Sequence, residues 1–120
     1  MLKALLDTNI IIAHVAGRKS IPLEPRDYGI STLTLFELFR LPGMTEEEND
    51  ALRELISFFD VFSVSAEIAS RAALLAKIRS KERPIDLLIA ATALELDVPL
   101  VTKNLKDFRS ISGLHMRESI

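Results

Sequence analysis

The sequence predicts an α/β protein: an α/β/α sandwich in which helices cover a mainly parallel sheet of four or five strands. Two observations lead to this fold class. Short apolar runs alternate along the chain with longer segments of helical periodicity, which is the pattern of repeated strand and helix units. The 120 residues also contain no internal repeat, low-complexity tract or interdomain linker, so we expect one domain over residues 1–120 with a core of its own.

The first half of the chain predicts two pairs of a strand and a helix. Each strand is a short apolar run, and each helix ends where the chain cannot easily continue it, at Gly17 for the first and at Pro42 and Gly43 for the second. The expected elements are a strand over Lys3–Leu6, a helix over Thr8–Ala16, a strand over Tyr28–Ser31 and a helix over Thr32–Leu41. Asp7 falls between the first strand and its helix.

The second half of the chain contains sequence signals for the starts of three helices. Thr45 with Glu48 three residues later forms a capping-box signature. Ser65 is placed to cap the next helix, and Pro84 suits the first turn of another. The expected elements are helices from Thr45 to about Phe59, from Ser65 to about Arg79 and from Pro84 to about Leu96, with strands over Val61–Val64, Leu100–Thr102 and Leu114–Met116.

Composition excludes several classes of protein. The chain contains no cysteine, which rules out thiolate chemistry and disulfides. No apolar run approaches the roughly 20 residues of a membrane span and the N-terminus lacks a signal-peptide layout, so we expect a cytoplasmic protein without membrane contact. A formal charge of -2 argues against capture of nucleic acid by the whole surface. Because 48% of the residues are hydrophobic and mean hydropathy is +0.23, we expect part of the apolar surface to contact a partner.

Three carboxylates in apolar surroundings point to a chemistry. Asp7 ends the first apolar run, Glu37 lies within an apolar helix, and Asp86 opens the last long helix. Ionised carboxylates gathered at the edge of a core repel one another and lose hydration unless something compensates. In parallel sheets ligands gather at the carboxyl ends of strands, where Asp7 and the segment after Thr102 both fall. Such oxygen ligands suit Mg²⁺ or Mn²⁺ and a phosphate substrate, so the sequence predicts metal-dependent phosphodiester chemistry.

Each acid also has a simpler structural explanation. Asp7 can cap the helix that follows it, and Asp86 can merely complement the dipole of its helix. Glu37 can be a solvated helix residue, although apolar residues crowd its helix. We favour a shared metal site because acids flanked by apolar residues occur in three separate segments.

Four short motifs, in the order of the predicted elements, resemble a PIN domain. They are Leu5-Leu6-Asp7-Thr8-Asn9, the helical Glu37, Pro84-Ile85-Asp86-Leu87-Leu88-Ile89-Ala90-Ala91 and Leu100-Val101-Thr102-Lys103-Asn104. The tail Phe108-Arg109-Ser110-Ile111-Ser112-Gly113-Leu114 is similar to PIN domains of the VapC toxin type, so the resemblance spans nearly the whole chain. It implies a Mg²⁺- or Mn²⁺-dependent endoribonuclease, typically the toxin of a VapBC toxin–antitoxin pair, often a homodimer and inhibited by a small VapB-like antitoxin.

The resemblance assigns roles to individual residues. The chain departs from the family at Asn104, where many relatives have an aspartate; the amide can still bind a metal-bound water, and Asp107 can supply the fourth acid. In the expected mechanism a metal held by Asp7 and Asp86 lowers the pKa of a bound water and neutralises charge on the phosphate, while Glu37 binds metal or positions the water. The expected catalytic and metal set is Asp7, Glu37, Asp86 and Asn104, with Asp107 as a further metal ligand and Thr8, Asn9 and Thr102 in support.

Two groups of basic residues are candidates for contacts with RNA phosphates. Lys103, Lys106 and Arg109 follow the last motif, while Arg79, Lys81 and Arg83 precede the Asp86 helix. Such contacts would position RNA without reading its sequence, although the first group suits a solvated surface equally well.

Other functions remain open from the sequence. The nearest are a PIN-domain RNA-processing nuclease that is not a toxin and a non-catalytic PIN-like binding module. A phosphotransferase with Asp7 as nucleophile lacks the second aspartate expected two residues later, where Asn9 stands. We also expect the chain to dimerise at micromolar concentration and to bind a partner helix in an apolar groove.

Overall fold

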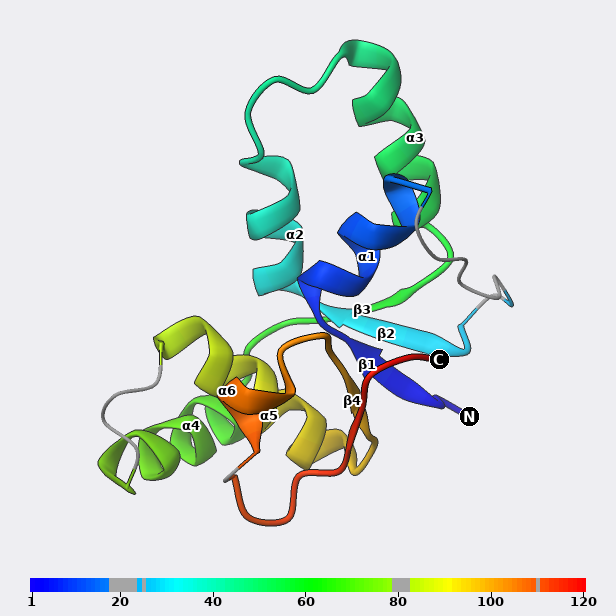
Figure 1. Cartoon of the computed structure of the whole chain (residues 1–120). Helices are drawn as coiled ribbons and strands as arrows, with labels where there is room; N and C mark the ends of the chain where they lie inside the picture. Colours follow the sequence, from blue (N-terminus) through cyan, green and yellow to red (C-terminus); the bar gives the residue numbers. More distant parts are fainter. Residues whose placement is uncertain (18–23, 25, 79–82, 110) are drawn as a thin grey trace.

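Five parallel strands form one sheet in the part of the chain that the computed structural model describes, residues 1–17, 24, 26–78, 83–109 and 111–120. The order is β3-β2-β1-β4-β5, so that β1 lies at the centre between β2 and β4 (Figure 1). The expectation of a mainly parallel sheet is confirmed. The strands are β1 (Ala4–Leu6), β2 (Tyr28–Ser31), β3 (Asp60–Phe62), β4 (Leu100–Val101) and β5 (Met116–Arg117).

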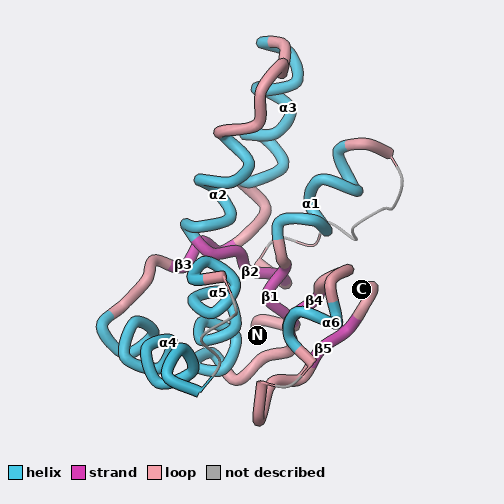
Figure 2. Tube along the Cα trace, turned by 60° about the vertical axis from the view of Figure 1, so that its left-hand side comes forward, coloured by secondary structure: helices cyan, strands magenta, loops and turns pink. Residues whose placement is uncertain are grey.

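Helices cover both faces of this sheet. α1, α2 and α3 lie on one side, and α4, α5 and α6 lie on the other (Figures 1 and 2). Two layers of helices therefore enclose the sheet, which confirms the predicted α/β/α sandwich. The helices are α1 (Thr8–Val15), α2 (Thr32–Phe39), α3 (Glu46–Ile56), α4 (Ala66–Ile78), α5 (Pro84–Leu96) and α6 (Leu105–Phe108).

The side chains of the central strand alternate between the two apolar layers. Ala4 and Leu6 of β1 pack with α1, α2 and α3, whereas Leu5 packs with α5. All three are at most 1% exposed. Successive strand residues point to opposite faces, so a strand buried on both faces is apolar at every position.

Most predicted helix starts are confirmed by hydrogen bonds. The Glu48 N–H donates to Thr45 Oγ1 at 3.1 Å and the Thr45 N–H donates to Glu48 Oε1 at 3.0 Å, which completes the capping box. The Ile68 N–H donates to Ser65 Oγ at 3.1 Å, and Pro84 opens α5. These local signals fix where α3, α4 and α5 begin.

Element ends differ from the prediction by a few residues. α3 ends at Ile56 rather than near Phe59, which is buried, and α2 ends at Phe39 rather than Leu41. The last strand is Met116–Arg117 rather than Leu114–Met116. The predicted end of the fourth helix at Arg79 lies outside the described residues. Element ends fray, and local sequence signals place them less precisely than the elements themselves.

Helix α6 was not predicted from the sequence. It is one turn long, with Asn104 at its N-terminal boundary and the buried Phe108 at its end. Phe108 packs in the same layer as Ile89 of α5, so a tertiary contact holds a helix that is too short to be stable alone. No helix in the described parts of the chain is long and apolar enough to cross a membrane.

Candidate metal centre

Asp7 lies at the junction where β1 becomes α1. Its backbone is extended and its N–H donates to Val101 O at 2.9 Å, which continues the pairing of β1 with β4. Its side chain is the N-cap of α1: the Thr8 N–H donates to Asp7 Oδ1 at 2.8 Å. The capping role expected of an aspartate at this position is therefore present, and it occupies one of the two carboxylate oxygens.

The other oxygen of Asp7 faces the end of β4. Asp7 Oδ2 accepts hydrogen bonds from Thr102 Oγ1 at 2.9 Å and from Asn9 Nδ2 at 3.2 Å. Asp7 is 5% exposed and Thr102 is 0% exposed. Thr102 and Asn9 therefore have the supporting contacts that the sequence predicted, and they fix the orientation of the carboxylate.

The pKa of Asp7 is raised above the ordinary value of an aspartate. Burial, which penalises the charged form, is the largest cause. Hydrogen bonds from Thr102 and Thr8 act in the opposite direction, and the charges of Asp86 and Glu37 raise the pKa further. Asp7 therefore lies within electrostatic reach of the other two acids. A bound cation would relieve the penalty on its charged form.

Glu37 lies on α2 and is held at the site by a hydrogen bond from Thr8. The Thr8 hydroxyl donates to Glu37 Oε1 at 2.6 Å and lies 3.3 Å from the hydroxyl oxygen of Thr34, one turn earlier on α2. Thr34 is fully buried. Sequence analysis missed Thr34, although its position three residues before Glu37 places it on the same face of the helix.

Asp86 comes from the first turn of α5 and is bound by its neighbour Arg83. Arg83 Nε donates to Asp86 Oδ2 at 3.1 Å and Arg83 Nη2 donates to Asp86 Oδ1 at 3.3 Å. Asp86 is buried, at 8% exposed. Sequence analysis counted Arg83 among possible RNA contacts and did not foresee this ion pair, although a spacing of three residues at a helix start allows one.

Asn104 completes the opposite side of the site. The Asn104 N–H donates to Thr102 Oγ1 at 3.0 Å. The Lys103 N–H donates to Asn9 Oδ1 at 3.0 Å, so Asn9 joins α1 to the segment after β4. The four sequence motifs therefore meet at the carboxyl ends of β1 and β4, where ligands of parallel sheets bind.

These side chains line one cavity. Its lining includes all four predicted catalytic residues and the supporting Thr8 and Asn9. Among the residues that the structure describes, no set of three or more His, Cys, Asp or Glu side chains is already gathered closely enough to hold a metal ion. The full lining is Asp7, Thr8, Asn9, Ile12, Glu37, Arg83, Asp86 and Asn104.

The remaining predicted residues lie outside this lining. Asp107 is exposed on α6. Its charge is one of the smaller causes that raise the pKa of Arg83, which lines the cavity. Lys103, Lys106 and Arg109 are exposed around α6. Arg79 and Lys81 lie outside the described residues. Asn104 therefore lines the cavity and Asp107 does not, and their roles as metal ligands stay predictions.

The donor set suits a hard divalent cation. Asp7, Glu37, Asp86 and Asn104 offer oxygen ligands from four segments of the chain, with neither sulfur nor imidazole in the lining. Such ligands match Mg²⁺ or Mn²⁺. Asp86 accepts hydrogen bonds from Arg83, and Glu37 accepts one from Thr8 through Oε1. An ionised carboxylate keeps further lone pairs with which it can bind an ion.

The fold and the cavity define a class: α/β/α proteins with a carboxylate-lined site at the carboxyl ends of a parallel sheet. Within it, the family model for the PIN domain matches residues 4–114. The chain belongs to the PIN domain family, as the sequence resemblance predicted.

Individual relatives share most of the chain. Ribonuclease VapC19 from Mycobacterium tuberculosis is 34% identical over 115 residues, covering 87% of this chain and 90% of that protein. The tRNA(fMet)-specific endonuclease VapC from Shigella flexneri is 28% identical over 98% of each chain. The crystal structure of DNA-bound VapBC from Salmonella typhimurium has a TM-score of 0.83 at 27% identity and also covers 98% of each chain.

Proposed function

We propose that this protein is a Mg²⁺- or Mn²⁺-dependent endoribonuclease of the VapC kind, the toxin of a toxin–antitoxin pair. The observation that carries the proposal is the single cavity in which Asp7, Glu37 and Asp86 meet Asn104. Relatives named as ribonuclease and endonuclease VapC, similar over most of the chain, support the reaction class.

The lining residues would divide the work of the reaction. Asp7, Asp86 and Glu37 would hold the cation, with Asn104 completing the ligands directly or through water. The chemistry that the cation supplies is neutralisation of charge on the phosphate and activation of water. Thr102 and Asn9 keep the Asp7 carboxylate oriented by the hydrogen bonds described above, and a fixed carboxylate need not reorganise during the reaction.

Basic residues beside the cavity would hold the RNA. Lys103, Lys106 and Arg109 are exposed and follow Thr102 in the chain, within a few residues of Asn104, so they are the candidates to bind RNA phosphates. Phosphate contacts position the substrate but do not select its sequence.

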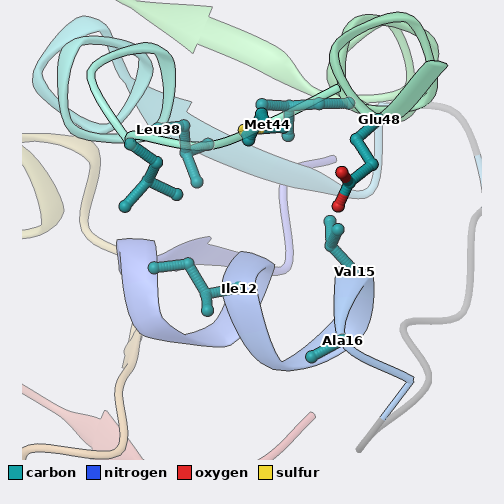
Figure 3. A pocket seen from close by; sticks show the side chains of 8 residues that line it. Ile12, Val15, Ala16, Leu38, Met44 and Glu48 are labelled. Carbon is teal, nitrogen blue, oxygen red and sulfur yellow. The ribbon is translucent and has the colours of Figure 1, made fainter. Parts of the chain in front are cut away.

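An apolar groove beside the cavity fits the helix of a small antitoxin. The groove lies between α1 and the α2–α3 pair: Figure 3 shows Ile12 of α1 facing Leu38 and Met44 across it, and Val15 of α1 facing Glu48. An amphipathic helix can lay its apolar face into such a groove. Ile12 lines both the groove and the acidic cavity, so a bound helix would lie next to the catalytic residues. The similar Salmonella protein was solved as DNA-bound VapBC, which supports a partner of this kind.

The test is cleavage of total cellular RNA by purified protein with Mn²⁺, Mg²⁺ or a chelator. Wild type should cut discretely with metal, and Asp7→Asn and Asp86→Asn should each abolish cutting while retaining the folded circular dichroism spectrum. Asp50→Asn, which removes an exposed carboxylate from α3, should cut like wild type. Cleavage that survives in chelator or in both site variants would refute the metal nuclease.

Inactivity of every form would favour a binding module. Mn²⁺ titration would then separate an intact metal site, with a substrate missing from that RNA, from a site that no longer binds metal. A gene for a small antitoxin beside the gene of this protein would separate a toxin from an RNA-processing nuclease.

A further inference from the structure

Arg83 binds both oxygens of a carboxylate that the proposed metal site needs. The two bonds, at 3.1 and 3.3 Å, join Nε and Nη2 to the two oxygens of Asp86. The side chain of Asp86 is 11% exposed and that of Arg83 is 71% exposed. The carboxylate is therefore fixed in the protein, whereas the guanidinium reaches it from the solvent side.

The Arg83 guanidinium stands among the acids that a metal ion would join. It lines the same cavity as Asp7 and Glu37. The pKa of Arg83 is raised chiefly by its hydrogen bond to Asp86 and by the charge of that residue, with smaller effects from Glu37 and Asp107. Among the cavity-lining residues in the described part of the chain, Arg83 is the one basic side chain. It thus supplies positive charge where a cation would otherwise supply it.

We propose that Arg83 is an exchangeable counter-ion of the metal site: it holds Asp86 while no cation is bound and releases it when a divalent cation binds. The released guanidinium then stays at the mouth of the cavity, where it binds an RNA phosphate. This inference rests on the proposed function, because the exchange matters only if Asp86 is a metal ligand.

Solvation and geometry make the exchange possible. An exposed guanidinium that leaves Asp86 is rehydrated at once, so its release costs little. The buried Asp86 carboxylate, in contrast, needs a partner of opposite charge. The incoming divalent cation takes this role from the Arg83 guanidinium. The planar fork of arginine that fits a carboxylate also fits a phosphate.

The exchange predicts that Arg83 weakens metal binding. A site that is partly occupied by an internal competitor shows reduced apparent affinity. Because the Arg83 side chain is exposed, its attraction to Asp86 is weakened by solvent, so removal of the competitor should tighten Mn²⁺ binding by about two- to fivefold. A residue that only positions Asp86 for the metal would have the opposite effect when removed.

The test is calorimetric titration of the full chain with Mn²⁺ alone. Arg83→Gln should bind Mn²⁺ about two- to fivefold more tightly than wild type, and Arg83→Lys, which keeps the charge but loses the fork, should lie between them. Arg71→Gln is the matched control, because it removes a guanidinium from the Arg71–Glu95 pair at 2.7 Å outside the cavity. It should leave the Mn²⁺ affinity unchanged.

A second measurement tests whether the released Arg83 guanidinium binds RNA. With saturating Mn²⁺, Arg83→Gln should bind a fluorescent single-stranded RNA with 2′-O-methyl riboses more weakly than wild type, with a smaller loss of affinity as salt rises. Equal or weaker Mn²⁺ binding by Arg83→Gln overturns the exchange, even if wild type binds Mn²⁺ and cleaves RNA. If neither protein binds Mn²⁺ and wild type does not cleave RNA, the proposed function fails together with the exchange.

Discussion

At the scale of single residues, the Thr102 hydroxyl forms hydrogen bonds with three other residues of the site. It donates to Asp7 at 2.9 Å and accepts from the side chain of Asn9 at 3.3 Å and from the Asn104 N–H at 3.0 Å. Its hydrogen bond lowers the pKa of Asp7 and so opposes the effect of burial. Thr102 therefore both orients the carboxylate and helps to keep it ionised.

Loss of this hydroxyl should weaken metal binding. Thr102→Val keeps the shape of the side chain but removes the donor to Asp7, and residues that orient metal ligands in this way typically contribute about tenfold or more to affinity. Calorimetric titration with Mn²⁺ measures the change. Thr92→Val is the matched control: Thr92 is equally buried, but its hydroxyl donates to Leu88 O within α5. Equal losses in the two variants would show that the effect is only one of stability.

The raised pKa of Asp7 makes a second prediction, on the stability of the metal-free protein. Because the folded pKa lies above the unfolded one, the native state holds the Asp7 proton more tightly. Its contribution to stability is fully present below the unfolded pKa and is lost as pH rises through the folded pKa. Asp7→Asn lacks this titration, so wild type should lose stability relative to Asp7→Asn as pH rises from acidic to neutral.

Urea unfolding in chelator over this pH range measures the difference. Saturating Mn²⁺ should reverse it, because a ligand that binds only the native state stabilises that state. A wild type that gains stability relative to Asp7→Asn as pH rises without metal would contradict the assigned direction of the pKa shift.

At the scale of elements, three different elements supply the acids of the site. Asp7 follows β1, Glu37 lies within α2, and Asp86 lies in the first turn of α5. The sequence predicted the end of β1 and the start of α5 because each carries a local signal: an apolar run that ends at a polar residue, and a proline at a helix start. The fold then brings the three acids to one cavity.

Local signals could not predict how the side chains pair across the fold. The contact of Thr8 with Thr34 and Glu37 joins residues far apart in the chain. The bond between Arg83 and Asp86 joins close neighbours, but only the rotamers of the folded state decide that it forms. Helix α6 was missed for the same reason, because burial of Phe108 and not helix propensity holds it in place.

Gly29 in β2 provides a prediction at this scale. A β-carbon at Gly29 would lie 2.6 Å from Cε2 of Phe62 on the neighbouring strand β3. Gly29→Ala should therefore lower the free energy of unfolding by about 1–3 kcal/mol through overpacking. Chemical denaturation measures the loss. Phe62→Leu in the same chain should recover part of it, and strictly additive effects of the two substitutions would exclude a clash between these residues.

At the scale of the whole molecule, the groove and the acidic cavity lie next to each other on α1. The groove is lined mainly by apolar residues of α1, α2, α3 and the segment between α2 and α3, together with the charged Glu48. Leu41, in the segment between α2 and α3, is 38% exposed. A second exposed apolar region lies on α4 in the opposite layer, at Leu74 and Ile78. The expected dimerisation stays a prediction, and light scattering at micromolar concentration would test it.

The groove predicts which surface residue the antitoxin needs. Leu41→Glu places a charge in the groove and should prevent copurification with a co-expressed small antitoxin, because an apolar helix face would have to bury that charge. Leu74→Glu, with the same change on α4, should still copurify. Loss of the partner from Leu74→Glu alone would move the binding surface to the other layer. Affinity chromatography of the co-expressed pair measures both.

The hydrogen bond from Thr102 to Asp7 joins residues 95 positions apart, and this separation governs when activity can arise during synthesis. The ribosome releases the first motif long before the strand that completes its surroundings. A nascent chain that ends before β4 therefore lacks the groups that orient Asp7, even though it already carries Asp7, Glu37 and Asp86. The hydrogen bond from Thr102 that orients Asp7 can therefore form only when translation of the chain is nearly finished.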